Sequence, residues 1–371
     1  MSSRILIVPD KFKGSLTARQ AADAIARGWR KARPKDFLSL LPMSDGGDGF
    51  GEVLSSLIGA KKRVVKTVDA AHRPLRCVWW WQPKAKTAII ESAKVNGLAM
   101  LAGKGLHPFQ LDTFGLGRVL QAAGKAGARK CIVGIGGSAT NDGGFGLARA
   151  LGWKFFGAGG GELQEWWQLS ELSEIHPASE TLNLHMTVAV DVRNPLLGLS
   201  GCSRIYGPQK GLRPEDFKLA EKCLAQLAKV LRKQCGIRAA DIPGAGAAGG
   251  LGFGLRVFAG AKIESGFDLF ARYARLEKHV KAADVAITAE GAMDKQTAMG
   301  KGVGQIARLC ARYGVPCIGF AGAVDKSVQQ GKVFAHARAL TEVADLTRAK
   351  SQAARCLEQL SMDTARVWAP N

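Results

Sequence analysis

Short apolar runs alternate with amphipathic stretches over most of the chain. Residues 5–8 and 130–135 are apolar runs bounded by turn-forming residues, a pattern that predicts buried strands. Residues 16–30 and 217–235 carry apolar side chains every three or four positions, which predicts amphipathic helices, and Ser15 or Thr17 is available to cap the first. The same patterns predict further strands at residues 64–68, 76–81, 87–91, 186–190, 285–288 and 316–321, and further helices at 113–126, 144–151 and 302–313.

The order of these elements predicts the fold class. Short apolar strands alternate with helices, which is typical of parallel, doubly wound α/β sheets, while the three strands between residues 64 and 91 suggest an antiparallel or mixed part. In such sheets ligands bind beyond the carboxyl ends of the strands. The residues expected at those ends are Pro9-Asp10, Gly136-Gly137, Asp191, Glu290 and Gly322.

The chain of 371 residues is long enough for two domains, because a single core rarely grows past about 250–300 residues. The strand, turn and helix units at its two ends fit one parallel sheet of flavodoxin-like or Rossmann-like type. We therefore expect one α/β domain from residues 1–64, 106–150 and 281–371, with a second α/β domain inserted as residues 65–105 and 151–280. The active site is expected in the cleft between them.

Composition indicates an ordinary soluble globular protein, with 47% hydrophobic and 22% charged residues. No apolar run approaches the roughly 20 residues of a membrane-spanning helix, and residues 5–8 are too few for a signal-peptide core. The eight cysteines are scattered, with no C-x-x-C pair and no histidines at zinc spacing, which indicates reduced, mostly buried thiols. Together these features predict a cytoplasmic protein with no membrane partner.

The formal net charge of +21 is a common first sign of nucleic-acid binding. Here, however, lysines and arginines are spread over the whole chain, with only short clusters such as Lys61-Lys62-Arg63 and Arg232-Lys233. This distribution favours a generally basic surface that attracts small anionic substrates, and no specific nucleic-acid partner is expected. Weak, salt-sensitive binding to nucleic acid would still follow from charge alone.

Five glycine-rich turns are the candidate chemistry of the chain. Clustered glycines turn at positive φ and leave backbone N–H groups free to face phosphate or carboxylate oxygens, although any single turn is equally compatible with a purely structural role. Most of the five also hold acids or lysines, which points to phosphoryl chemistry. They are Asp45-Gly46-Gly47-Asp48-Gly49, residues 134–144, Gly207-Pro208-Gln209-Lys210-Gly211, residues 244–252 and residues 290–301.

Three well-known signatures are absent. A Walker A loop is excluded because Gly300-Lys301 is followed by Gly302 rather than by serine or threonine. Residues 244–249 match G-x-G-x-x-G but follow Asp241-Ile242-Pro243 instead of a strand, so they are not a dinucleotide fingerprint. The run from Gly136 to Thr140 lacks the last glycine of a nucleophile elbow.

The remaining polar residues suit a kinase with a different phosphate cradle. Ser138, Thr140 and Asn141 are expected between a strand and a helix, where an anion can be held. Asp142 is as compatible with capping that helix as with binding a ligand. Asp45 and Asp48 share one turn and suit magnesium, or else form Asx turns with the local backbone.

Seven ordered motifs resemble the bacterial glycerate kinases that phosphorylate D-glycerate, and the resemblance covers nearly the whole chain. The motifs are residues 8–16 (VPDKFKGSL), 42–49 (PMSDGGDG), 134–144 (GIGGSATNDGG), 191–196 (DVRNPL), 206–211 (YGPQKG), 243–250 (PGAGAAGG), and 290–301 with Glu290-Gly291, Asp294, Gln296-Thr297 and Gly300-Lys301. The resemblance implies ATP-dependent, Mg²⁺-dependent transfer of a phosphoryl group to D-glycerate in a two-domain α/β protein. In this family the product is most often 2-phosphoglycerate, with 3-phosphoglycerate possible, and a homodimer is also possible.

Phosphoryl transfer needs positioning, a metal, cations and a carboxylate that accepts or orients the hydroxyl proton. We assign that carboxylate first to Asp191, which ends a predicted strand, and second to Asp45. Lys13, Lys210 and Lys301 would neutralise phosphate or the glycerate carboxylate. Gly136, Gly137, Ser138, Thr140 and Asn141 would provide further contacts to ATP, and Glu290 and Asp294 would bind magnesium.

Two positions depart from the family pattern. Ala292 stands where the family usually has arginine, and Arg118 stands where it usually has glutamate. Either change could alter substrate preference or lower the rate. A protein that binds anions or nucleotides without catalysis is therefore the second hypothesis, and a basic nucleic-acid-binding protein is the third.

Overall fold

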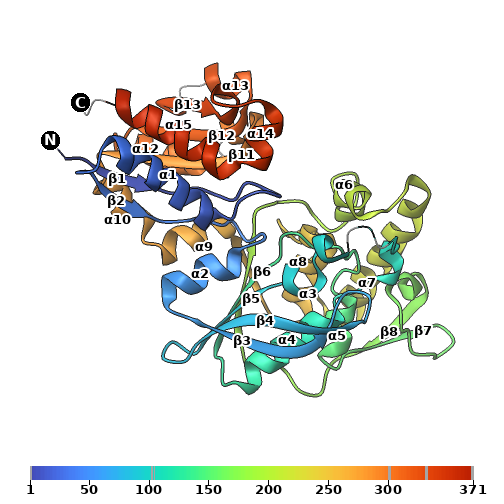
Figure 1. Ribbon diagram of the computed structural model, residues 1–371. Coiled ribbons are helices and arrows are strands. Elements are labelled where there is room, and N and C mark those ends of the chain that lie inside the picture. Colours follow the sequence, from blue (N-terminus) through green and yellow to red (C-terminus); the bar gives the residue numbers. More distant parts are fainter. Residues whose placement is uncertain (1, 102, 104, 300–301, 331–332, 369–371) are drawn as a thin grey trace. The chain divides into compact units, whose positions relative to one another are not determined.

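The computed structural model describes residues 2–101, 103, 105–299, 302–330 and 333–368. The chain divides into two compact units. The terminal unit comprises Met1–Ser44 and Phe267–Asn371, and the middle unit is the uninterrupted segment Asp45–Gly266. Each unit is built around its own mixed α/β core (Figure 1).

The terminal unit contains a five-stranded sheet with the order β13-β12-β11-β1-β2, and all four neighbouring pairs are parallel. Its strands are β1 (Arg4–Ile7), β2 (Phe37–Leu40), β11 (Val285–Met293), β12 (Cys317–Val324) and β13 (His336–Ala339). Its helices are α1 (Ala18–Ala32), α10 (Leu276–Lys281), α11 (Lys295–Ala298), α12 (Gly304–Arg312), α13 (Lys326–Gln330), α14 (Leu346–Ser351) and α15 (Ala353–Val367); α9 (Gly266–Tyr273) begins at the unit boundary.

Helices from opposite ends of the chain meet in the terminal unit. Thr17 is the N-cap of α1, as one of the two predicted candidates, and its hydroxyl accepts a hydrogen bond from Gln20 N. Helix α15 lies beside α1 (Figure 1), where Arg27 and Lys31 both pair with Glu358. The apolar faces of the two helices share a core with β1, β11 and β12.

The middle unit contains a six-stranded mixed sheet with the order β10-β9-β6-β5-β4-β3. Its strands are β3 (Lys61–Val68), β4 (Pro74–Gln82), β5 (Thr87–Glu91), β6 (Lys130–Gly134), β9 (His185–Val190) and β10 (Lys262–Ser265), with a separate hairpin of β7 (Lys154–Gly157) and β8 (Leu172–His176). Its helices are α2 (Phe50–Ile58), α3 (Ala93–Asn96), α4 (Phe114–Lys125), α5 (Phe145–Ala150), α6 (Cys202–Tyr206), α7 (Phe217–Cys235) and α8 (Ala247–Phe258).

The predicted α/β class with parallel sheets is confirmed, and the three strands between residues 61 and 91 form the mixed part. β3 and β4 pair antiparallel, as do β4 and β5, whereas β5, β6, β9 and β10 are parallel neighbours. All eight cysteines are unpaired, and all but the half-buried Cys235 are buried, as predicted. Among the described residues, no helix is both long and apolar enough to cross a membrane.

The unit boundaries differ from those predicted. Residues 45–64 and 106–150 were placed with the chain ends, but β6 pairs with β5 and β9, so these segments belong to the middle unit. Residues 267–280 were placed in the inserted domain and belong to the terminal unit. The physical reason is that both units contain parallel strands alternating with helices, so the local pattern does not reveal which sheet a strand joins.

Candidate active site

In the middle unit, one glycine turn lies across the carboxyl ends of four parallel strands. The turn Asp45-Gly46-Gly47-Asp48-Gly49 begins beside the end of β10, where a methyl group on Gly266 would lie 1.7 Å from the Asp45 carbonyl oxygen. It then passes β9 and β6, and Gly136 N donates to Gly46 O at 3.0 Å. It ends at β5, where Gly49 N donates to Glu91 Oε1 at 3.1 Å. The carboxyl edge of this sheet is therefore organised by a single turn.

The approach between this turn and the loop after β6 leaves room only for glycine. Gly46 has φ +108°, and a methyl group there would lie 2.8 Å from the carbonyl oxygen of Ala189 in β9. A methyl group on Gly136 would lie 2.6 Å from the Cα of Gly47. Such distances are far below van der Waals contact, so the two glycine turns pack backbone against backbone.

Glu91, at the end of β5, holds the turn in place through two hydrogen bonds, and the sequence pattern did not identify it. The side chain is buried, accepts hydrogen bonds from Gly49 N and Gly51 N, and lies 3.8 Å from Lys94 Nζ. Burial raises the pKa of Glu91, and Lys94 and the two N–H donors oppose that increase. A carboxylate also complements the positive end of α2, which starts at Phe50. The sequence feature that could have identified Glu91 is an acid at the end of an otherwise mostly apolar predicted strand, residues 87–91.

The two predicted magnesium carboxylates of this turn lie in different settings. Asp45 is half-buried, and its Oδ1 accepts from Gly47 N at 3.4 Å, which is the Asx-turn contact that was the alternative interpretation. Asp48 is exposed, and a methyl group on Gly137 would lie 2.6 Å from its Oδ1. Asp45 thus bonds to its own turn, whereas Asp48 lies beside Gly137 of the loop after β6.

The loop from Gly134 to Gly144 carries four of the predicted polar residues, and side chains from other segments of the middle unit hydrogen-bond to them. Asn96 Nδ2 donates to Ser138 Oγ and to Thr140 Oγ1, and the two hydroxyls are 2.8 Å apart. Asn141 Nδ2 donates to Ser203 Oγ. These side chains hold the shape of the loop, and Asn96 and Ser203 are partners that sequence analysis did not identify.

Two acceptors in this cluster stand out. Asn96 Oδ1 and Asn141 Oδ1 are both buried, and neither has a hydrogen-bond partner among the residues that the structure describes. Leaving a buried acceptor without a donor costs about 1–3 kcal/mol. Such atoms fit a ligand or water that supplies hydroxyl or N–H donors to this loop.

Lys210 reaches the same loop from the turn after α6. Its buried Nζ donates to Thr140 O at 2.7 Å, and burial lowers the pKa of Lys210 to about 8. Gly249, at φ +71°, makes room for this contact, because a methyl group there would lie 2.0 Å from Thr140 O and 2.8 Å from Lys210 Nζ. A buried ammonium that has lost part of its hydration is a favourable partner for an anion.

Asp191 directly follows β9 and is exposed, as expected for a residue at a strand end. Its charge acts on Tyr206, whose pKa is raised mainly by burial and further by Cys202 and Asp191. Tyr206 Oη donates to Asn194 Oδ1 at 2.6 Å, and Asn194 Nδ2 donates to Ser200 O. Asn194 and Tyr206 lie within the family motifs at 191–196 and 206–211, which was the signal that could have identified them.

The remaining predicted residues lie in the terminal unit, at the ends of β1 and β11. Thr297 Oγ1 donates to Glu290 Oε1 at 2.7 Å, and Asp294 Oδ1 accepts from Gln296 N and Thr297 N at the start of α11. Lys13 is exposed, and its backbone N would lie 3.4 Å from a methyl group on Gly291. Lys301 lies outside the described residues.

No group of three or more histidine, cysteine or acidic side chains is arranged for a metal within the described part of the chain. Glu290 and Asp294 are two carboxylates that both contact Thr297. Magnesium usually takes one or two protein carboxylates together with phosphate oxygens and water, so this oxygen donor set fits Mg²⁺. The two departures from the family pattern, Arg118 and Ala292, are both exposed.

Comparisons with known proteins agree with this description. The model of the glycerate kinase family matches residues 5–369. A glycerate kinase from Halalkalibacterium halodurans is 36% identical, with 98% of this chain and 97% of that protein covered. A glycerate 2-kinase from Escherichia coli is 35% identical, covering 90% and 88%. A solved structure described as glycerate kinase 2 from Salmonella typhimurium superposes with a TM-score of 0.82 at 31% identity, covering 98% of each chain. The chain therefore belongs to the glycerate kinase family, whose members are kinases that phosphorylate an alcohol group.

Proposed function

We propose that the protein transfers the terminal phosphoryl group of ATP to the 2-hydroxyl of D-glycerate, giving 2-phosphoglycerate and ADP. The 3-hydroxyl is the alternative acceptor. The observation that carries the proposal is the buried Lys210 ammonium at Thr140 O, beside glycine turns packed at four strand ends. This arrangement brings a cation to a loop that follows β6, and open α/β sheets bind ligands beyond the carboxyl ends of their strands.

The phosphates of ATP are assigned to the loop from Gly134 to Gly144. Gly136 and Gly137 let this loop turn tightly against the turn at Asp45–Gly49, and the Lys210 ammonium at Thr140 O supplies the positive charge for the phosphates. Ser138, Thr140 and Asn141 keep the loop in shape through Asn96 and Ser203. The buried acceptors Asn96 Oδ1 and Asn141 Oδ1 fit hydroxyl donors of a substrate or of bound water.

Proton transfer is assigned to Asp191. This carboxylate is exposed at the end of β9, and the fixed Tyr206–Asn194 hydrogen bond lies near it. A carboxylate in that place can accept or orient the hydroxyl proton as the phosphoryl group leaves ATP. Asp45 is the second candidate, because it lies on the turn that crosses the same strand ends.

Charge neutralisation and metal binding are assigned to the terminal unit. Glu290 and Asp294 would hold Mg²⁺ directly or through water, and Lys13 and Lys301 would neutralise the glycerate carboxylate or phosphate oxygens. When bound, Mg²⁺ offsets the negative charge of the phosphates. Eight unpaired cysteines are consistent with a reducing compartment, so we also propose a cytoplasmic location.

Phosphorus NMR of the purified protein with ATP, Mg²⁺ and D-glycerate tests the proposal, with L-glycerate, glycerol and tartronate as comparators. A new phosphomonoester signal is expected, and its coupling to the glycerate protons assigns the 2- or 3-position. Absence of product in every mixture, with ATP or glycerate binding by calorimetry, would instead support a binding protein without catalysis. DNA affinity that persists at high salt would support the nucleic-acid hypothesis.

Asp191→Asn tests the assigned proton acceptor. Removing a positioned acid or base costs about 10²- to 10⁴-fold in turnover, while ATP affinity and the melting temperature should stay close to those of the parent protein. Glu162→Gln removes an exposed charge of the same unit and is the matched control, expected to be fully active. Near-normal turnover of Asp191→Asn would transfer the role to Asp45.

A further inference from the structure

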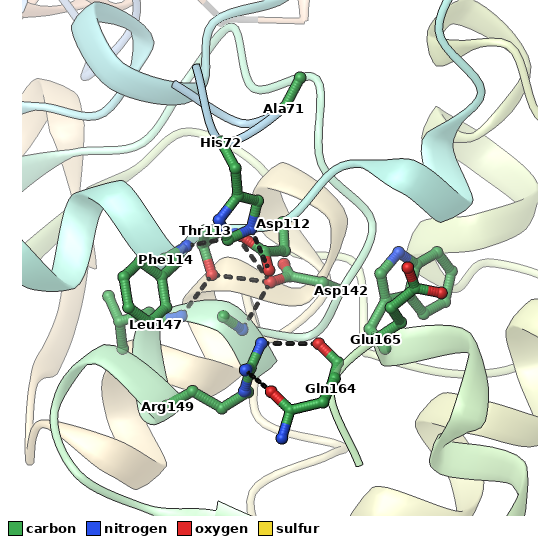
Figure 2. Close-up of polar contacts among 12 residues, drawn as sticks. Ala71, His72, Asp112, Thr113, Phe114, Asp142, Leu147, Arg149, Gln164 and Glu165 are labelled. Carbon is green, nitrogen blue, oxygen red and sulfur yellow. Dashed lines mark hydrogen bonds and ion pairs between the residues drawn. The ribbon is translucent and has the colours of Figure 1, made fainter. Parts of the chain in front are cut away.

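Polar contacts join the half-exposed His72 to Asp112, and join the next residue, Thr113, to the fully buried Asp142 (Figure 2). Asp112 and Thr113 lie just before α4, and Asp142 directly follows the loop residues Thr140 and Asn141. The three segments come from different parts of the middle unit. None of these four residues has a place in the proposed phosphoryl transfer.

Asp142 binds more donors than any other carboxylate described above. Its Oδ2 accepts from Thr113 N at 2.9 Å, from Thr113 Oγ1 at 2.7 Å and from Gly146 N at 3.0 Å. Its Oδ1 accepts from Gly144 N at 3.2 Å. Thr113 Oγ1 in turn accepts from Leu147 N at 2.9 Å. The carboxylate thus ties the end of the glycine loop and the start of α5 to the start of α4, which agrees with the capping alternative.

A second carboxylate, Asp112, acts on Asp142 electrostatically and is paired with His72. Asp112 Oδ1 accepts from Phe114 N, and Asp112 Oδ2 lies 2.9 Å from His72 Nε2. The hydrogen bond to Asp112 raises the pKa of His72. His72 has φ +58°, a strained conformation for a residue other than glycine, and its ring packs at 5.5 Å from that of Phe114. The surroundings therefore hold the imidazole against Asp112.

Other charges also face this group. Lys210 interacts electrostatically with Asp142, and so does the acid Asp112. Arg149 and Asp69 act on His72 with opposite signs. The guanidinium groups of Arg118 and Arg149 lie 4.9 and 5.9 Å from the Phe114 ring centre. Around Asp142 itself, therefore, one acid opposes ionisation and one lysine favours it, while His72 offsets the charge of that acid.

We propose that ionised Asp142 is a positioning residue for the Gly134–Gly144 loop, and that the His72–Asp112 pair sets the pH above which it is ionised. The inference rests on the proposed role of this loop in binding phosphate. The consequence is that the rate of phosphoryl transfer falls below a certain pH, and that the charges of His72 and Asp112 determine this pH. Asp142 and Asp112 are not catalytic residues, because their contacts are to the loop and the helix starts.

The hydrogen-bond pattern explains why protonation would matter. Thr113 N, Thr113 Oγ1 and Gly146 N donate to Oδ2, and Gly144 N donates to Oδ1. A neutral carboxyl group accepts hydrogen bonds more weakly than a carboxylate, so protonation weakens the contacts that tie Gly144 N and Gly146 N to Asp142. Burial and the neighbouring Asp112 raise the pKa of Asp142 to about 6, within the range where an enzyme is readily assayed.

The first test compares the pH dependence of kcat/KM for ATP in the parent protein, two variants and one control. Asp112→Asn removes the neighbouring negative charge, so the acid limb should move to lower pH than in the parent. His72→Gln leaves the charge of Asp112 without its partner, so the limb should move to higher pH. Shifts of roughly half a unit or more in these opposite directions are expected for charges this close. His176→Gln removes another paired histidine of the same unit and should leave the limb in place.

The second test does not depend on catalysis. Hydrogen exchange of the Gly144 and Gly146 amides can be measured by NMR between pH 5 and 8. Their protection, which is the intrinsic exchange rate at each pH divided by the measured rate, should fall below the pH at which half of Asp142 is protonated. The midpoint should move with Asp112→Asn and His72→Gln as the acid limb does. An inactive protein that shows these exchange midpoints would contradict the proposed function alone. Equal midpoints in all variants, or shifts of the same sign, would overturn the inference about Asp142.

Discussion

The candidate site of the middle unit is shaped mainly by close backbone packing, whereas that of the terminal unit is made of exposed or half-buried side chains. At the strand ends of the middle unit, glycines pack at distances that exclude a methyl group, and Lys210 and Glu91 are buried. At the strand ends of the terminal unit, Lys13 and Asp294 are exposed, and the carboxylates of Glu290 and Asp294 bind the start of a four-residue helix.

This difference teaches where each kind of substitution should act. A backbone cradle is already organised before a ligand arrives, so it offers donors at little entropic cost but does not tolerate added volume. Exposed carboxylates tolerate changes of shape, yet their function depends on charge. Volume changes should therefore be severe in the middle unit, and charge changes should dominate in the terminal unit.

Gly249→Ala should have the largest effect. Alanine at φ +71° costs about 1–2 kcal/mol, and a methyl group 2.0 Å from Thr140 O adds roughly 1–3 kcal/mol of overpacking. The same displacement of the loop should lower kcat/KM by about 10²-fold or more. Urea unfolding followed by tryptophan fluorescence gives the free energy of unfolding, and a coupled assay of ADP release gives the rate.

Gly160→Ala is the matched control for that substitution. Gly160 lies in the same unit at φ +76°, but no described atom lies within 4 Å of a methyl group there. It should lose about 1–2 kcal/mol for the left-handed conformation alone and keep its activity. Equal losses of stability and activity in the two variants would contradict the view that packing around Gly249 matters.

Lys210→Met should have the next largest effect. A charge-assisted hydrogen bond contributes about 1.5–3 kcal/mol, so ATP affinity should fall by roughly 10- to 100-fold. Because burial lowers the pKa of Lys210 to about 8, the cation is present below that pH and is lost as the pH rises through it. Calorimetry should therefore show ATP affinity of the parent protein declining above about pH 8. That decline should be absent from Lys210→Met.

The same pKa shift has a consequence for stability. Since the folded state disfavours the charged form of Lys210, the contribution of this group to folding becomes more favourable as the pH rises from about 8 towards 10.5, the ordinary pKa of lysine.

The control for the ATP-affinity test is Lys125→Met, at the exposed end of α4, which should alter neither ATP affinity nor its pH dependence. An unchanged affinity in Lys210→Met would remove this lysine from the phosphate site.

Asp294→Asn tests the terminal unit. Asparagine caps a helix about as well as aspartate, so the stability should change by less than about 0.5 kcal/mol. Loss of the charge should raise the Mg²⁺ concentration for half-maximal activity by about tenfold, if the carboxylate is worth about 1.4 kcal/mol to the metal. Asp325→Asn is the control, because Asp325 likewise accepts from a backbone N–H at the start of α13. The same Mg²⁺ dependence in both variants would argue against a metal at Asp294.

The sequence predicted the positions of helices and strands better than it predicted which strands pair with each other. The strand at residues 87–91 and the helix at 217–235 have the predicted bounds, because burial and helical periodicity leave a clear local pattern. Strands β2 and β13 were missed because they have four residues each and no run of buried apolar side chains, and α8 was missed because it contains four glycines. Which sheet each strand joins depends on contacts that no local pattern records.

The candidate site shows the same limit. Motif spacing identified Lys210 and the loop 134–144, and the structure brings them together at Thr140 O. Asn96, Ser203 and Glu91 were missed because each contacts the site through residues about 40–60 positions away in sequence. Asp142 was left open between capping and binding, and only its four donors distinguish the two.

Ala292→Arg is expected to have the smallest effect, and it addresses the departure from the family pattern. Ala292 is exposed at the end of β11, two residues from both Glu290 and Asp294, so an arginine fits without repacking. If the guanidinium steadies substrate or phosphate, kcat/KM for D-glycerate should rise by about three- to tenfold, which is about 0.6–1.4 kcal/mol. Ala323→Arg, on the neighbouring strand at the paired position, adds the same charge and is the control. A gain confined to Ala292→Arg would show that charge at one exposed position tunes the terminal unit, whereas equal gains would reduce the effect to general attraction of anions by a more basic surface.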